Sequence, residues 1–217
     1  MAEFPSRILF KPTSDCHRIA PKPTIDGDLA DWGDLKPLPR LCELDGHEGF
    51  ADVWVAWADD GLYIAERCPK PQGTVSVNRQ RPHAGDGLQA WVDTRATQNA
   101  HRATRFCHQF IFLPKGAGAG RSQATAWQAN IRRARERASL CNPSDIRIAS
   151  FIGEGFYTIE AHLPLHVLGG FGPSVGSQIG FNYVVHDIPS GSQRWSAPRG
   201  FPMDWDPSLW GLLELVD

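Results

Sequence analysis

The sequence has little net charge, and it offers no apolar segment at its start. Its 217 residues carry 22 basic and 24 acidic side chains, a net charge of −2, so the global charge does not favour nucleic acid or an anionic membrane surface as a partner. Contents of 41% hydrophobic and 21% charged residues are typical of a globular chain. The opening MAEFPSRILFKP is too polar for a signal peptide, so we expect a cytoplasmic location.

Cysteines are few and widely spaced. No Cys-x-x-Cys pair occurs, which excludes a zinc knuckle or a thioredoxin-type motif. Disulfide frameworks normally use even numbers of cysteines, and this chain has five, so we expect reduced thiols. The five are Cys16, Cys42, Cys68, Cys107 and Cys141.

Helical periodicity is also scarce. Only 164–168 and 131–140 could form helical turns. The remaining pattern is one of short β-branched or aromatic segments between Gly, Pro, Asn and Asp, which is typical of strands joined by hairpin turns. The segments are Asp52–Ala58, Leu62–Cys68, Leu88–Val92, Phe106–Leu113, Ile146–Ile152, Phe156–Leu163, Gln178–Asp187 and Leu209–Val216.

Eight or more strands with almost no helix indicate an all-β sandwich or barrel, and the periodicity alone does not decide between these two. There is no internal repeat and no linker, so residues 1–217 are expected to form a single domain, with 1–17 as an N-terminal lead-in.

Four stretches decide between sandwich and barrel by resemblance. They are TIDGDLADWG (Thr24–Gly33), the Ala51–Pro71 hairpin followed by GDGLQAWVD (Gly85–Asp93), EGFYTIEAHLPL (Glu154–Leu165), and IGFNYVVHD (Ile179–Asp187) with the ending Trp205–Val216. In this order and spacing, over about nine-tenths of the chain, they resemble family 9 carbohydrate-binding modules, relatives of the DOMON-like domains.

The resemblance implies an antiparallel, jelly-roll-like β-sandwich of two packed sheets with few short helical turns. It also implies that Ile25 is buried, that Asp26-Gly27 forms a turn, and that Trp32 seals one end of the sandwich.

The same resemblance places a sugar site. In sugar-binding members two Trp side chains clamp a terminal sugar, because sugar C–H faces stack on aromatic rings. One clamp position corresponds to His83 and the other to Asp204, with Trp205 displaced by one. A pocket Glu corresponds to Gln89. An Arg and an Asn of the next strand correspond to Ile111 and Leu113, so the scaffold matches the family while most of the pocket does not.

Tryptophan and arginine supply further candidates. Trp205, in a polar loop, is the best candidate for a stacking platform. Trp195 is a second choice, and Trp91 is expected to be buried in the core. Clustered arginines could grip a uronate or a sulfated sugar, but a solvated charged face is the favoured explanation, because acidic residues keep the total charge near zero. The predicted ligand-binding residues are Trp205, His83, Gln89, Asp204, Trp195, Arg81 and Arg199.

No catalytic constellation is recognisable. The segment around Ser174 matches a nucleophile elbow, but Pro173 precedes the serine and the segment reads as a loop. Glu160 is expected on a strand, with no second acid placed for glycoside hydrolysis. We therefore predict no enzyme activity.

No metal site is predicted either. His162 and His166 have helical ligand spacing, but Pro164 separates them after a strand-like segment. Relatives suggest structural calcium at the acidic loops, 26–31 and 59–60, but turn formation explains the same residues. We therefore predict no metal centre and no cofactor.

The sequence thus favours a non-catalytic ligand-binding domain, with a neutral or acidic saccharide as partner and neither nucleic acid nor membrane. One alternative is an intracellular interaction or structural domain that kept the fold and lost the sugar clamp. Another is a haem-binding DOMON-type domain with Met203, expected in a solvent-side loop, as an axial ligand. An open groove lined by a Trp face and by polar groups that reach sugar hydroxyls would favour sugar, and a filled pocket beside a flat apolar patch would favour a protein partner. The oligomeric state stays open.

Overall fold

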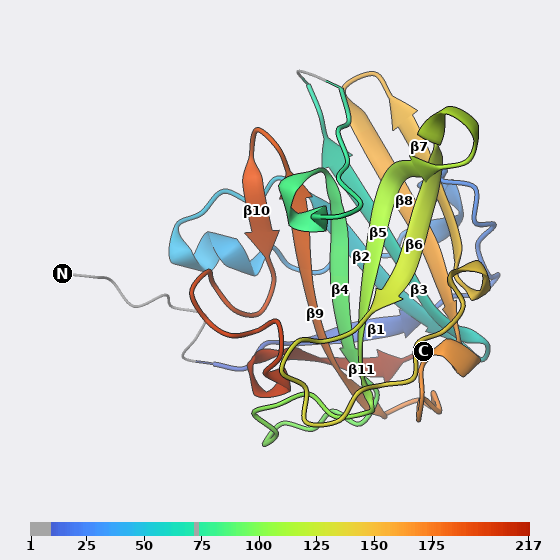
Figure 1. Cartoon of the computed structure of the whole chain (residues 1–217). Coiled ribbons are helices and arrows are strands. Elements are labelled where there is room, and N and C mark those ends of the chain that lie inside the picture. The colour runs from blue at the N-terminus through green and yellow to red at the C-terminus, as the bar shows by residue number, and fades with distance from the viewer. Residues whose placement is uncertain (1–9, 72–73) are drawn as a thin grey trace.

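The computed structural model describes residues 10–71 and 74–217, and it is an all-β protein (Figure 1). Its strands are β1 Thr13–Arg18, β2 Asp52–Ala58, β3 Gly61–Pro69, β4 Gly87–Asp93, β5 Cys107–Ala117, β6 Gln123–Ala129, β7 Arg147–Gly153, β8 Phe156–Pro164, β9 Gln178–Asp187, β10 Gly191–Arg194 and β11 Gly211–Val216. The described helical structure is limited to short 3₁₀ turns: η2 Leu29–Trp32, η3 Leu41–Asp45, η4 Pro82–Ala84, η5 Ala119–Arg121, η6 Pro143–Asp145, η7 Leu165–Val167 and η8 Pro207–Leu209. No described helix is long and apolar enough to cross a membrane.

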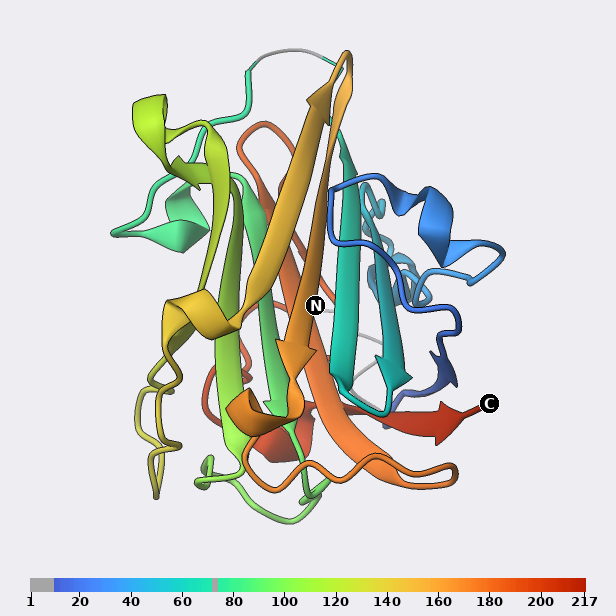
Figure 2. The ribbon, with the colours of Figure 1, turned by 90° about the vertical axis from the view of Figure 1, so that its right-hand side faces the viewer.

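The strands form two packed layers, as Figure 2 shows edge-on. The hydrogen-bonded order is β6-β5-β4-β9-β11-β1-β2-β3-β8-β7, and β10 extends from β9. Strands β5 and β6 contact β7 and β8 across the layers, so the sheet nearly closes on itself. The predicted β-sandwich is confirmed. Its pairings are antiparallel except at β1, which runs parallel to both β11 and β2 and makes the sheet mixed.

The β2–β3 hairpin shows how local sequence fixes the register. Asp52 pairs with Arg67 and Ala58 with Gly61, joined by the predicted Asp59-Asp60-Gly61 turn. Gly61 has φ +151°, and a Cβ at this position would overlap the carbonyl oxygen of Leu163 on the neighbouring strand β8. Only glycine fits where the hairpin meets β8 this closely.

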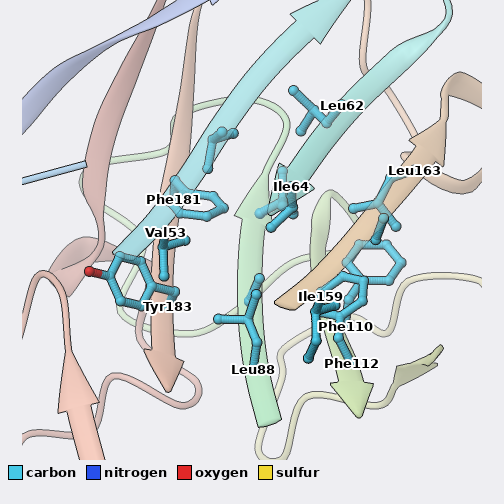
Figure 3. Packing of buried hydrophobic residues seen from close by; sticks show 14 of the residues in the cluster. Val53, Leu62, Ile64, Leu88, Phe110, Phe112, Ile159, Leu163, Phe181 and Tyr183 are labelled. Atoms are coloured by element: carbon cyan, nitrogen blue, oxygen red, sulfur yellow. The ribbon is translucent and has the colours of Figure 1, made fainter. Parts of the chain in front are cut away.

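The main core lies between the two layers, and strand alternation supplies it (Figure 3). Alternate residues such as Leu88 on β4 and Phe110 on β5 face Val53, Ile64 and Ile159 from the opposite layer. These side chains are at most 1% exposed. The alternation also decides which residues face outward, and that set contains the candidate site.

Two smaller apolar clusters cover the outer faces. On the β2–β3 side, Trp32 packs over Ala56, Tyr63 and Ala65. The predicted end-sealing role of Trp32 is therefore wrong, because its ring lies on the outer face of a sheet. Its indole Nε1 donates to Glu160 Oε1 at 2.9 Å. On the β4–β9 side, the loops that follow β4, β6 and β10 bury a second cluster of Trp91, Ala103, Cys107, Ile131, Val184, Ala197, Met203 and Trp210.

Several boundaries differ from the sequence prediction. Thr13–Arg18 is a strand of the sheet, so the N-terminal lead-in is shorter than 1–17, and residues 1–9 of it lie outside the described chain. Residues 131–140 form an irregular loop instead of helical turns. The turn predicted at 164–168 is present as η7. The five cysteines are unbridged.

Candidate functional site

A groove of about 1030 Å³ lies on the outer face of the β5-β4-β9-β10 layer. Because Leu88 and Ala90 point into the core, Gln89 and Trp91 point outward and form its floor. In Figure 1, β10 and η4 flank β4 and β9 around this face. The other lining residues are Cys42, His47, Glu48, Phe50, Pro82, His83, Gln109, Ile111, Arg132, His186, Ser190, Gly191, Ser192, Gln193, Arg194, Arg199 and Asp204.

Four polar side chains make a continuous ladder across the floor. Gln109 Nε2 on β5 donates to Gln89 Oε1 on β4 at 3.2 Å. Since that oxygen accepts, Gln89 Nε2 is the donor to His186 Nε2 on β9, at 3.1 Å. His186 therefore carries its proton on Nδ1, which donates to Ser192 Oγ on β10 at 2.9 Å. The Ser192 hydroxyl proton and the Gln109 amide oxygen are left for a ligand.

The imidazole in this ladder is neutral at pH 7. The pKa of His186 is lowered to about 4, mainly by burial, with smaller contributions in the same direction from Arg194 and His83. A neutral ring can accept from Gln89 and donate to Ser192 at the same time, as the ladder requires.

The groove walls are anchored by a buried ion triad. Lys70 Nζ lies 2.8 Å from Asp86 Oδ1 and 2.6 Å from Asp187 Oδ1, and all three side chains are at most 5% exposed. Asp86 Oδ1 also accepts the Ile188 amide, and Asp187 Oδ2 accepts the Ser190 amide. The triad thus fixes the β9–β10 hairpin beside η4.

Trp91 forms the base of the groove. It is 2% exposed and packs on the second cluster, as the sequence predicts for a core residue. Its indole Nε1 is buried and makes no hydrogen bond among the described residues. Trp91 and Gln89 both line the groove, so its floor combines an indole with a primary amide.

The structure brings four of the seven predicted ligand-binding residues together. His83, Gln89, Arg199 and Asp204 all line the groove, the first and last on opposing loops. Ile111 lines it as well, at the position where the resemblance puts an Arg, whereas Leu113 is buried and outside the lining.

The other three lie outside the groove lining. Trp195 is completely buried between Phe181 and Tyr183, so it presents no face on which a sugar could stack, and we remove it from the site. Trp205 is half-buried against the second cluster, with the Arg133 guanidinium 4.8 Å from its ring centroid. Arg81 is exposed and directly precedes η4.

Sequence reasoning missed several lining residues. His186 and Gln109 lie on predicted strands, and their outward parity is the signal that could have found them. Ser192 and Arg194 lie on β10, a four-residue strand, GSQR, without an apolar pattern. Arg132 lies in the loop that the sequence suggested could be helical.

The groove carries charges of both signs. Arg132, Arg194 and Arg199 line it, as do Glu48 and Asp204. Arg194 is partly engaged, since its Nη1 lies 3.2 Å from the sulfur of Met203. Met203 itself is completely buried in the second cluster, which corrects its expected place in a solvent-side loop.

Several acidic side chains that were considered for metal binding or catalysis hold turns and loops in place. In residues 10–71 and 74–217, no group of three or more His, Cys, Asp or Glu side chains could hold a metal ion. The acidic turns accept backbone amides, as from Ala30 to Asp28, or pair with Lys22. Glu160 accepts the amides of Asp26 and Gly27 in addition to the indole of Trp32.

Comparison of the coordinates with solved structures identifies the fold. A family 9 carbohydrate-binding module from Caldicellulosiruptor kristjanssonii, in complex with glucose, is similar with a TM-score of 0.63 and 15% identity over 93% of this chain and 95% of that chain. A complex of a family 9 module from the same organism with cellotriose is similar with a TM-score of 0.63 and 16% identity over 94% of each chain. A candidate carbohydrate-binding protein from Bacteroides uniformis is similar with a TM-score of 0.58 and 11% identity over 95% of this chain and 100% of that chain.

The fold is therefore that of family 9 carbohydrate-binding modules. No protein-family model matches the sequence. A search of curated proteins likewise finds no match.

Proposed function

We propose that the protein is a non-catalytic carbohydrate-binding domain whose site is the groove over β4, β5, β9 and β10. The observation that carries the proposal is the ladder from Gln109 through Gln89 and His186 to Ser192, in a groove flanked by His83 and Asp204. Structures of the same fold are complexes with glucose and cellotriose, which supports a saccharide as the ligand.

The groove offers what a sugar needs. Hydroxyl groups require paired donors and acceptors, and the ladder ends in an amide oxygen on one side and a hydroxyl on the other. Phe50 and Ile111 add apolar surface for the C–H faces of a sugar ring. The groove volume lies at the upper end of the range for small-molecule sites, so it has room for more than one sugar unit.

A non-catalytic role agrees with the chemistry of the floor. Amides, a neutral imidazole and a hydroxyl orient a ligand by hydrogen bonds, and the two lining carboxylates, Glu48 and Asp204, come from separate loops. Glycoside hydrolysis needs two carboxyl groups held across one glycosidic bond.

The test is calorimetric titration with glucose, cellotriose, other neutral oligosaccharides and uronate oligosaccharides. We expect saturable binding of at least one. Gln89→Ala interrupts the ladder at its centre, and we expect it to weaken that binding about tenfold or more, which is about 1.4 kcal/mol.

Gln178→Ala is the matched control, because Gln178 is exposed at the far end of β9. It should bind like the unmodified chain. If the folded protein binds no sugar in the panel, or if both variants bind equally well, the proposal is wrong.

A further inference from the structure

A second cavity, of about 320 Å³, lies at one end of the sandwich and shares no lining residue with the groove. It is lined from three places: Arg105 just before β5 and His108 near the start of that strand, Arg137 and Cys141 in the loop after β6, and residues 166–167 and 169–170 in and after η7. That loop and η7 both lie at the lower end of the molecule in Figures 1 and 2. The size is near the lower limit for small-molecule sites.

The buried imidazole of His108 has a defined proton position. Gln128 Oε1 accepts the backbone amide of Cys141 at 2.9 Å, so Gln128 Nε2 is the group that donates to His108 Nδ1, at 3.0 Å. His108 Nδ1 is therefore an acceptor, and the ring proton is on Nε2. Burial lowers the pKa of His108 to about 4, which keeps the ring neutral with this single N–H.

The Nε2–H of His108 is a donor without an acceptor. His108 is 2% exposed, and Nε2 makes no hydrogen bond among the described residues. Its ring edge faces Gly169 in the cavity wall, where an added Cβ would lie 3.7 Å from Nε2. The Gly169 carbonyl, which also accepts the Thr94 hydroxyl at 2.7 Å, lies near enough to raise the pKa of the ring, but its contact with Nε2 does not have the geometry of a hydrogen bond. A buried donor left without a partner costs free energy, so an acceptor from a ligand would stabilise this site.

The charged side chains in the rest of the lining are positive. Arg105 and Arg137 make no ion pair with the described residues, and no Asp or Glu lines the cavity. His166 also lines it, with its Nε2 3.7 Å from Asp145 outside the lining. Two guanidinium groups and one buried N–H donor, with no carboxylate among them, match a ligand that supplies only acceptors and negative charge.

We infer that this cavity binds a small oxyanion, such as a phosphate or carboxylate group, between Arg105, Arg137 and His108. The guanidinium groups supply charge and paired donors from the surface, and the His108 Nε2–H supplies the buried end of the site. The inference is independent of the sugar groove, because a different set of residues carries it.

The experiment uses the full chain with inorganic phosphate, glucose 6-phosphate and malonate as separate probes. Thermal unfolding is followed with each, against sodium chloride at equal ionic strength. We expect at least one probe to raise the melting temperature and to give a saturable calorimetric isotherm. The three probes distinguish a free phosphate, a phosphorylated small molecule and a carboxylate as the source of the oxyanion.

Arg137→Gln and Arg105→Gln change exposed side chains, so these variants should fold. Each is expected to weaken oxyanion binding by about tenfold or more. Arg135→Gln is the matched control, because Arg135 is exposed in the same loop but lines neither the cavity nor the groove, and it should bind the oxyanion like the unmodified chain. The inference is overturned if no probe exceeds the chloride control, or if Arg137→Gln and Arg135→Gln behave alike.

A failure here would leave the sugar-binding proposal standing, because Gln89→Ala does not touch this cavity. The ¹⁵N spectrum of the His108 ring gives an independent check. We expect the Nε2–H tautomer in the free protein, and we expect the ¹⁵N chemical shift of Nε2 to change when a probe that binds is added.

Discussion

At the scale of single residues, Glu66 is the most unusual group in the core. It faces the interior of the sandwich from β3, completely buried, and Tyr157 donates its hydroxyl to Glu66 Oε1 at 3.0 Å. Its Oε2 makes no hydrogen bond among the described residues. Burial raises the pKa of Glu66 to about 8. The Tyr157 hydrogen bond opposes the shift, and the charges of Asp86 and Asp187 add to it.

Glu66 therefore makes stability depend on pH. The folded state holds the proton more tightly than the unfolded state, so the stabilisation is fully present below about pH 4.5 and is lost as pH rises through about 8. We expect the free energy of unfolding to fall by about 2–4 kcal/mol between pH 5 and pH 8.5 from this group. Glu66→Gln, which stays neutral, should flatten that dependence, as measured by urea unfolding across this range. A parallel pH dependence in both proteins would refute the assignment.

Single positions also show which site residues a resemblance can predict and which the side-chain type alone cannot. His83, Gln89 and Asp204 were placed by correspondence, and they converge because the shared scaffold positions them. Trp205 and Trp195 were chosen for their side chains, and both lie outside the groove lining. An indole brings a large apolar area, and in this fold Trp195 gains more by filling the core between Phe181 and Tyr183 than by facing solvent.

At the scale of elements, two lysine clusters make a natural comparison. Lys70 bridges Asp86 and Asp187 with its side chain 5% exposed, and Lys22 bridges Asp59 and Asp60 with its side chain 43% exposed. The first cluster joins β3 to β4 and to the β9–β10 hairpin, while the second lies at the surface beside the β2–β3 turn.

Removing the buried charge of Lys70 should destabilise the fold far more than removing the exposed charge of Lys22. We expect Lys70→Met to lower the free energy of unfolding by about 3–5 kcal/mol, because two buried carboxylates lose their counter-charge. Lys22→Met should leave it almost unchanged, because solvent screens an exposed ion pair. Urea unfolding followed by tryptophan fluorescence measures both. Equal effects would contradict the anchoring role given to the triad.

The strands show which elements a sequence reveals. β2 and β9 have the predicted bounds because their apolar residues run almost unbroken, with both faces covered. β1, β6 and β10 went unpredicted because few of their residues are apolar and buried: in β1, TSDCHR, only Cys16 is buried. Pairing with other strands creates these elements: β1 pairs with the distant β11 and β2, and β6 and β10 each pair with the strand before them. The local apolar pattern carries no record of this pairing.

At the scale of the whole molecule, the sandwich separates two sites. The inward residues of the strands build one core, and the outward residues of β4, β5, β9 and β10 are free to form the groove. The oxyanion cavity lies at one end of the same sandwich, where His108 is the inward residue next to the opening of the core. Each site can therefore change without disturbing the other.

The central claim is that a saccharide lies over the floor of the groove. The most direct measurement is the set of indole ¹H–¹⁵N resonances of the eight tryptophans during titration with the oligosaccharide that binds most tightly. Trp32 and Trp57 are internal references, because their Nε1–H groups donate to Glu160 and to the Val216 carbonyl, far from the groove lining. We predict that the Trp91 indole shifts while these two stay fixed. A saturated complex that leaves Trp91 unchanged, or that shifts Trp205 alone, would contradict the account.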